Sequence, residues 1–177
     1  DGVIDSKDVK AIGYTDVPEI VYGFGVSAQW KGFDVSVFFQ GNDHVSFSIN
    51  SSMVRGFTEP KMAANNVFSD IYGNYWTESN TDAKYPRLTT TEATNNNQVS
   101  DFWLVNGRYL RLKNAEFGYT FPKKLIQKIR LSQLRIFVSG TNLLTFAPFK
   151  LWDPDLQTGA SNYPNTRVAN IGLNIGF

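Results

Sequence analysis

The 177-residue chain has no cysteine and a single histidine, His44, and both shortages limit the kinds of metal site and catalytic site that it can form. Without cysteine it can form neither disulfide bridges nor thiolate metal sites. A Ser-His-Asp arrangement would have to use His44, yet no nucleophile elbow or oriented base stands near it. Asp153 and Asp155 fit a turn better than the carboxylate pair of a glycosidase, whose separation across a sugar sequence cannot show. The sequence therefore predicts that the chain is not an enzyme.

Two further shortages concern partners and membranes. The formal net charge is only +1, which gives no reason to expect nucleic acid as a partner. No apolar run approaches the roughly 20 residues of a membrane-spanning helix. Strands of a membrane barrel alternate lipid-facing and lumen-facing residues, however, so a barrel stays open as a fold. The chain also begins without methionine or signal peptide, and we expect it to be a segment of something longer.

The most informative stretch is Gly107–Pro122, where apolar residues alternate with polar or small ones over an unusual length. Such alternation indicates a β-strand with two different faces. At Lys113-Asn114 the phase slips, because apolar positions are even before it and odd after it. A β-bulge produces such a flip. The pattern predicts one bulged strand. Its outer face should carry Leu110, Leu112, Ala115, Phe117 and Tyr119, and its inner face Arg111, Asn114 and Glu116.

Four more segments alternate in the same way, and they predict strands at 20–30, 33–40, 134–141 and 167–177. The connections between the five strands are short, long, short and long. A membrane barrel has short turns in the periplasm and long loops outside, so the order assigns Lys31-Gly32 and the basic connector 122–131 to the periplasm. The connector could hold a single helical turn, and the spacing within 65–76 predicts a short helix in the first long loop.

Aromatic residues make up 15% of the chain and fall into two groups. The first group, at the strand ends beside the short turns, fits the interfacial girdle of a barrel or the edge of a sandwich core. The second group lies in the long loops, where it could contact a substrate or a partner or pack within the loops. The first comprises Trp30, Phe33, Tyr119 and Phe121, and the second Tyr75, Trp76, Trp103 and Trp152.

The first eight residues have the composition of the second half of a calcium loop, with Asp1, Asp5 and Asp8 as candidate ligands. A complete site needs six or more oxygen ligands, and the front half of the pattern is missing here. An Asp-rich turn is the alternative interpretation. Calcium is the only cofactor that the sequence suggests.

Several ordered motifs together resemble the C-terminal part of the SusC/RagA family of TonB-dependent outer-membrane transporters. The resemblance covers nearly the whole chain. The motifs are Asp1-Gly-Val-Ile-Asp5, Trp30-Lys-Gly-Phe-Asp34-Val-Ser, Trp76-Thr-Glu-Ser-Asn80-Thr-Asp-Ala, Tyr85-Pro-Arg-Leu88, Tyr109-Leu-Arg-Leu-Lys-Asn114, Phe117-Gly-Tyr-Thr-Phe-Pro122, Leu134-Arg-Ile-Phe-Val-Ser-Gly-Thr-Asn-Leu143 and the terminal Phe177.

The resemblance implies an all-β fold in which residues 1–177 supply about five C-terminal strands of a large antiparallel transmembrane barrel, 22-stranded when complete. It also implies a Bacteroidetes-type importer in the outer membrane of a Gram-negative bacterium. Such an importer takes up glycans or oligopeptides with a SusD-like surface lipoprotein and draws energy from TonB. Phe177 would be the signal for membrane insertion. The plug and the earlier strands are absent from this chain, and since five strands cannot close a barrel, they would be partners supplied by the same protein or a separate chain.

A soluble secreted β-sandwich that binds carbohydrate is the alternative. The two folds differ in what covers the apolar strand faces, which is lipid in a barrel and a second sheet in a sandwich.

Overall fold

The strand β5 (Tyr109–Thr120) lies in the middle of a five-stranded antiparallel sheet. The computed structural model describes residues 7–49, 52–55, 67–90, 94–158 and 162–177. The chain divides into two units. We call them the sheet unit, which comprises Pro18–Asp43, Arg108–Pro148 and Tyr163–Phe177, and the loop unit, which comprises Asp1–Val17, His44–Gly107 and Phe149–Asn162.

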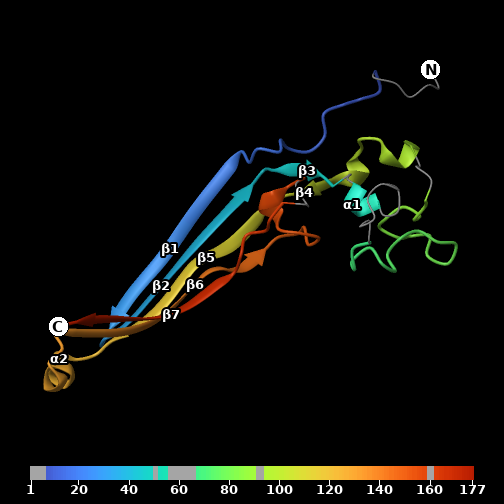
Figure 1. Cartoon of the computed structure of the whole chain (residues 1–177). Helices are drawn as coiled ribbons and strands as arrows, with labels where there is room; N and C mark the ends of the chain where they lie inside the picture. Colours follow the sequence, from blue (N-terminus) through green and yellow to red (C-terminus); the bar gives the residue numbers. More distant parts are fainter. Residues whose placement is uncertain (1–6, 50–51, 56–66, 91–93, 159–161) are drawn as a thin grey trace. The chain divides into compact units, whose positions relative to one another are not determined.

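The sheet unit has the strand order β1-β2-β5-β6-β7, and every neighbouring pair is antiparallel (Figure 1). Five strands were predicted, and five form this sheet. A tight turn at Lys31-Gly32 joins the first two, and both turn residues have positive φ. The short helical connector between β5 and β6 is confirmed. The other elements are β1 (Ile20–Trp30), β2 (Phe33–Asp43), α2 (Lys123–Ile126), η3 (Gln127–Ile129), β6 (Gln133–Phe146) and β7 (Val168–Gly176).

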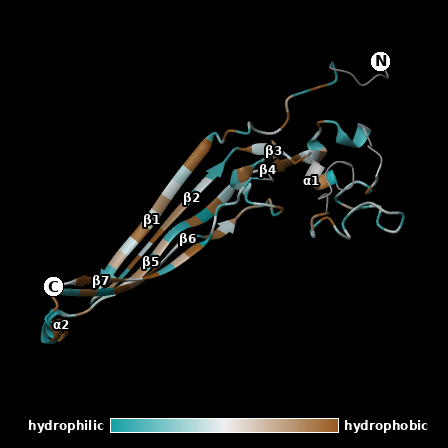
Figure 2. Cartoon of the chain, in the orientation of Figure 1, coloured by the Kyte–Doolittle hydropathy of each residue, from teal (hydrophilic) through white to brown (hydrophobic). Residues whose placement is uncertain are grey.

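Each strand of the sheet separates its residues onto two faces. Residues directly opposite in an antiparallel pair share a face, and the register sets Phe24 opposite Phe39 and Val35 opposite Phe117. Ring contacts follow from this register, since Phe24 stacks on Phe39 at a centroid distance of 5.3 Å. We call this side the apolar face and the opposite side the polar face. Figure 2 shows the resulting bands of hydropathy along the strands.

The predicted bulge in β5 is present at Lys113. Phe38 pairs with Asn114 and Phe39 pairs with Leu112, so Lys113 has no opposite residue on β2. Leu112 therefore shares the apolar face with Ala115, although the two residues are separated by an odd number of positions. Arg111, Asn114 and Glu116 lie on the polar face, as predicted.

The neighbouring strand β6 has an irregularity that the sequence did not predict. Asn114 pairs with Thr141 and Leu112 with Leu144, so Asn142 and Leu143 together stand opposite Lys113. Asn142 has φ of 52°, in the left-handed region that asparagine tolerates better than most residues. Its side-chain amide donates to the carbonyl of Thr166 at 2.9 Å, which ties β6 to the segment before β7.

A charged triad lies on the polar face of the sheet. Arg135 of β6 donates from Nε to Oδ1 of Asp34 at 3.0 Å and from its terminal nitrogen to Oε1 of Glu116 at 2.5 Å. A second contact from the guanidinium reaches the other carboxylate oxygen of Asp34, which makes that pair bidentate. The guanidinium also covers Gly118, where a side chain would collide with it. The triad therefore joins β2, β5 and β6 on one face.

Replacement of Arg135 by methionine is expected to lower the unfolding midpoint of the assembled protein by several degrees. The change leaves Asp34 and Glu116 side by side on the polar face without their shared cation. Thermal unfolding followed by circular dichroism would measure the loss. The variant R135M/D34N/E116Q removes all three charges and should recover most of it; a triple variant no more stable than R135M would contradict this explanation.

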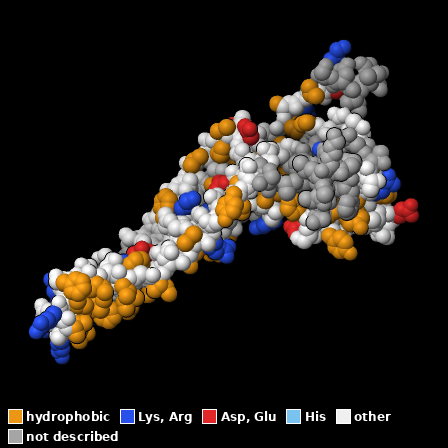
Figure 3. All heavy atoms as spheres, viewed as in Figure 1, with side chains coloured by type: hydrophobic (Ala, Val, Ile, Leu, Met, Phe, Trp, Pro, Cys, Tyr) orange, Lys and Arg blue, Asp and Glu red, His pale blue; other side chains and the backbone are white. Residues whose placement is uncertain are grey.

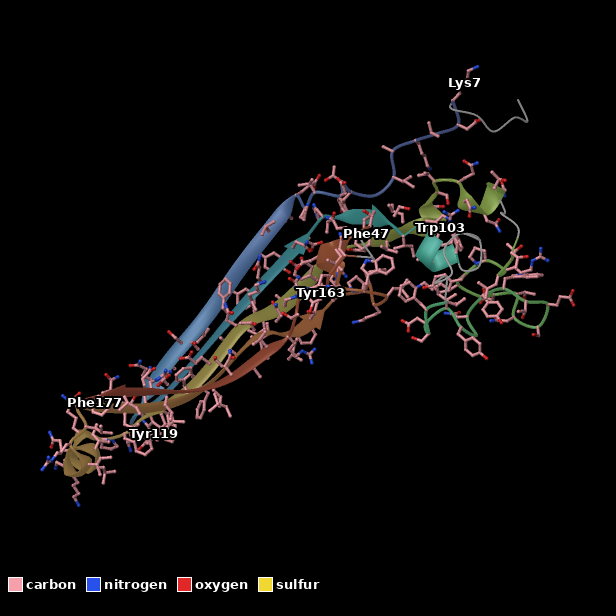
Figure 4. All side chains as sticks on the ribbon, in the orientation of Figure 1. Lys7, Phe47, Trp103, Tyr119, Tyr163 and Phe177 are labelled. Carbon is pink, nitrogen blue, oxygen red and sulfur yellow. The ribbon has the colours of Figure 1, made fainter. Side chains whose placement is uncertain are left out.

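The loop unit has a small core of its own. Its regular elements are β3 (Ser46–Ser48), α1 (Ser52–Arg55), η1 (Thr94–Asn97), η2 (Asp101–Trp103), β4 (Leu104–Asn106) and η4 (Pro154–Leu156). The strands β3 and β4 pair antiparallel. The side chains of Phe47 and Trp103, both labelled in Figure 4, are buried in this core. The cluster is completed by Ile49, Val54, Ile71, Tyr85 and Phe149.

One element of the loop unit differs from its prediction. A short helix was predicted within 65–76, and the described part of that segment, 67–76, forms turns and an isolated bridge instead of a helix. The apolar residues there do not form one helical face, because Ile71 is fully buried in the core while the adjacent Tyr72 is exposed. Among the described residues, no helix is long and apolar enough to cross a membrane.

Candidate functional site

The loop unit contains an open cleft of about 440 Å³. Two exposed aromatic side chains, Trp76 and Phe102, lie on its walls. Their exposed fractions are 37% and 52%. The remaining lining residues are Ala83, Tyr85, Pro86, Arg87, Asn95, Asn96 and Ser100.

Backbone hydrogen bonds fix the wall that carries Trp76. Its amide donates to the carbonyl of Tyr85 at 2.9 Å, and the amide of Tyr85 donates to the carbonyl of Asn74 at 3.1 Å. These bonds form a short parallel bridge between Tyr75 and Tyr85. The turn between them is closed by reciprocal bonds between Thr77 and Asn80. Trp76 is therefore presented from a pinned loop, which reduces the entropy lost when a ligand binds.

Trp103 supports, from within the core, the part of the cleft that Asn96 and Phe102 line. Its side chain is only 1% exposed, and Nε1 donates to the carbonyl of Asn96 at 2.7 Å. Its ring packs edge-on against Phe102 at 4.8 Å. The sequence left two roles open for Trp103, contact with a substrate or partner and packing within the loop. The structure places its side chain in the core, and a contacting role stays a prediction. Phe102, which the sequence reasoning did not single out, is the exposed aromatic residue at this position.

The other two predicted contact residues lie away from the lining of this cleft. Tyr75 and Trp152 are half-buried and pack against the core of the loop unit. Trp152 stands edge-on to Phe149 at 4.7 Å and donates from Nε1 to the carbonyl of Gln157 at 2.7 Å. The structure thus brings only Trp76 of the four predicted residues to the cleft, and a contacting role for Tyr75 and Trp152 stays a prediction.

The cleft combines aromatic surface with hydrogen-bonding groups of both kinds. Aromatic faces can stack on a sugar ring or hold an apolar side chain, and the amides of Asn95 and Asn96 can both donate and accept. Arg87 adds a cation that suits a carboxylate. Burial, with a smaller contribution from the charge of Asp70, raises the pKa of Tyr85, so its phenol stays neutral. Such a cleft can bind an uncharged or anionic ligand.

The remaining predicted sites stay predictions. Asp1 and Asp5 of the calcium-type loop lie outside the described residues, and Asp8 is exposed. Within the described part of the chain, no group of three or more His, Cys, Asp or Glu residues could hold a metal ion. Phe177 is 95% exposed at the end of the sheet unit, and its role in membrane insertion is untested.

The known proteins to which the chain is similar in sequence are TonB-dependent receptors. The chain is 31% identical to the TonB-dependent receptor P3 of Formosa agariphila over 99% of its own length and 18% of the relative. It is 27% identical to the TonB-dependent receptor SusC of Bacteroides thetaiotaomicron, over 99% of the chain and 17% of that receptor. No family model matches the chain.

Solved structures agree with these relatives. The chain superposes on the RagAB peptide importer in its open-open state with a TM-score of 0.71 and 26% identity, covering 99% of this chain and 19% of that one. The closed-closed state gives a TM-score of 0.70. Over nearly its whole length, the chain matches TonB-dependent transporters of the SusC/RagA type.

This SusC/RagA-type chain spans only 17–20% of the length of the receptors to which it is compared above. The five-stranded sheet matches part of a large barrel, and the predicted total of 22 strands stays a prediction. The relatives are receptors and importers, in agreement with the prediction that the chain is not an enzyme. The superposition on RagAB favours the barrel over the alternative β-sandwich.

Proposed function

We propose that the chain is part of an outer-membrane importer of a Gram-negative bacterium, which takes up glycans or oligopeptides with a SusD-like lipoprotein and is energised through TonB. The observation that carries the proposal is the likeness to RagAB over 99% of the chain, in a five-stranded sheet with one largely apolar face and one face that holds the charged triad. The apolar face contacts lipid, and the polar face lines the lumen. Its mechanism is binding and gated passage.

The sheet needs further strands to work in a membrane. Backbone groups along an open edge in lipid would lack hydrogen-bond partners, at a cost of several kcal/mol each. The edge strands β1 and β7 therefore pair with the remaining strands of the barrel, and the polar face, with its charged triad, faces the plug. TonB acts on the plug, so the complete receptor, and not these residues alone, couples transport to energy.

The cleft in the loop unit contacts the substrate or the lipoprotein lid. The loop unit is built from the segment before β1 and from the two long connections, and the long connections lie outside the cell in a barrel of this direction. Trp76 and Phe102 are the exposed anchors of the cleft, and aromatic anchors of this kind carry a large share of the binding energy in interfaces.

The double variant W76A/F102A is expected to weaken substrate uptake or lid association about tenfold or more, since each lost aromatic anchor contributes on the order of 1–2 kcal/mol. Uptake of labelled glycan and of labelled oligopeptide by cells carrying the full receptor would measure the first. Co-purification of the lipoprotein would measure the second.

The matched control is Tyr72→Ala, which removes an aromatic side chain that is 79% exposed in the same unit but does not line the cleft. It should leave both uptake and association unchanged. If W76A/F102A also changes neither, the cleft is not the contact site. If the receptor transports neither labelled ligand, the proposed function itself fails.

A further inference from the structure

The connector between β5 and β6 carries a concentration of cations at one end of the sheet unit. Lys123, Lys124, Lys128 and Arg130 are all exposed, and the segment 117–134 contains no acidic residue. Within the described part of the chain, no ion pair or side-chain hydrogen bond involves these four residues. Lys31, in the neighbouring short turn, places its Nζ 4.7 Å above the ring of Trp30.

The same connector exposes an apolar pair. Leu125 is 57% exposed and Ile129 is 62% exposed, and the four-residue spacing puts them one helical turn apart. Ile126 between them is 3% exposed and anchors the connector, and its carbonyl accepts from the amide of Leu131 at 3.1 Å. The connector therefore displays apolar side chains among cations and is held in place by a different residue.

Aromatic side chains indicate the depth at which this connector would lie in a membrane. Rings of Phe33, Tyr119 and Phe121 form a continuous series, with centroid distances of 4.6 and 5.0 Å. Trp30 is 69% exposed at the same end. In a membrane-spanning sheet such rings lie at the interface between hydrocarbon and headgroups. Because Lys31 follows Trp30 directly and Lys123 comes two residues after Phe121, the cations lie at the level of the headgroups.

Figure 3 shows this arrangement on the surface, with Lys and Arg side chains at the tip of the sheet unit next to a patch of apolar side chains. Figure 4 places Tyr119 and Phe177 at the same end. Cations beside exposed apolar side chains are the combination by which protein segments bind anionic lipid surfaces.

We propose that this basic connector, together with Lys31, binds the headgroups of anionic phospholipids in the periplasmic leaflet. The cations neutralise the headgroup phosphates while Leu125 and Ile129 enter the boundary of the acyl chains. An acidic protein can also satisfy the charges, but the aromatic rings beside the connector favour a lipid surface, where Leu125 and Ile129 meet the acyl chains. The inference rests on the proposed outer-membrane location, which sets the level of the aromatic rings.

The test uses the full receptor that contains this chain, reconstituted in nanodiscs of phosphatidylcholine and phosphatidylglycerol in equal amounts. After gentle extraction, native mass spectrometry counts the lipids of each kind that stay bound. We expect the wild-type receptor to retain phosphatidylglycerol several-fold over phosphatidylcholine, and K123Q/K124Q/K128Q/R130Q to lose most of that excess. The excess should also fall as ionic strength rises.

The charge-conserving variant K123R/K124R/K128R is the matched control, and it should retain the excess. L125S/I129S keeps the cations and should reduce the number of retained lipids. An equal phosphatidylglycerol content in wild type and the four-residue Gln variant would overturn the inference. So would loss of an acidic protein partner from the Gln variant without any change in bound lipid. A receptor that inserts and imports but shows no lipid preference refutes only this inference, whereas failure to insert refutes the proposed function.

Discussion

Replacement of Trp103 by alanine is expected to destabilise the loop unit by about 3–5 kcal/mol, the usual range for removal of a buried Trp or Phe side chain. The indole is 1% exposed and belongs to the core with Phe47, Ile49 and Ile71. The substitution would also remove the Nε1 bond to the Asn96 carbonyl and the ring that supports Phe102. Both the core and one wall of the cleft should therefore loosen together.

Hydrogen exchange in the assembled receptor would measure this loss locally. The amide of Ile49 donates to the carbonyl of Trp103 at 2.9 Å, so its exchange reports on opening at that position. Trp103→Phe serves as the control, because it keeps most of the buried ring and loses about 1 kcal/mol with the hydrogen bond. Amides of the sheet unit should exchange as in the wild type. Protection at Ile49 that survives W103A would contradict the assignment of Trp103 as a core residue.

The case of Trp103 shows where the sequence stops being informative. Tyr75, Trp76, Trp103 and Trp152 stand in long loops without a periodic pattern, and nothing local separates a core ring from an exposed one. Trp103 is buried because β3 and β4 bring distant parts of the first long loop together, and such contacts leave no trace in spacing. The helix predicted within 65–76 failed for the same reason, since Ile71 is placed by the core and not by helical periodicity.

The sheet unit was predictable because its information is local. In a strand with two different faces, apolar and polar residues alternate along the sequence. The bulge at Lys113 appeared as a break in this alternation between Leu112 and Ala115. The charged triad was not predictable in this way. Arg135 and Asp34 are 101 positions apart, and their contact depends on the alignment of β2, β5 and β6 across the sheet.

Replacement of Gly41 by alanine is expected to destabilise the sheet unit by about 1–3 kcal/mol, the usual cost of overpacking. A methyl group at this position would lie 2.5 Å from the carbonyl oxygen of Tyr109 and 2.7 Å from the Tyr22 ring. The ring could turn away, but the carbonyl belongs to the backbone of the neighbouring strand. The backbone of Tyr109 cannot shift easily, because its own amide donates to Oδ1 of the buried Asn42 side chain at 3.1 Å.

Gly23→Ala provides the matched control on the same sheet. A methyl group there meets the tip of the Phe38 ring at 2.9 Å, with the nearest backbone atom at 3.4 Å, so a small rotation of the ring relieves it. Thermal unfolding of both variants in lipid, with hydrogen exchange across β2 and β5, would compare them. G41A should lower the unfolding midpoint and loosen the end of the β2–β5 ladder near Tyr109, while G23A should change neither. Equal effects would mean that backbone approach at Gly41 does not limit the pairing of β2 with β5.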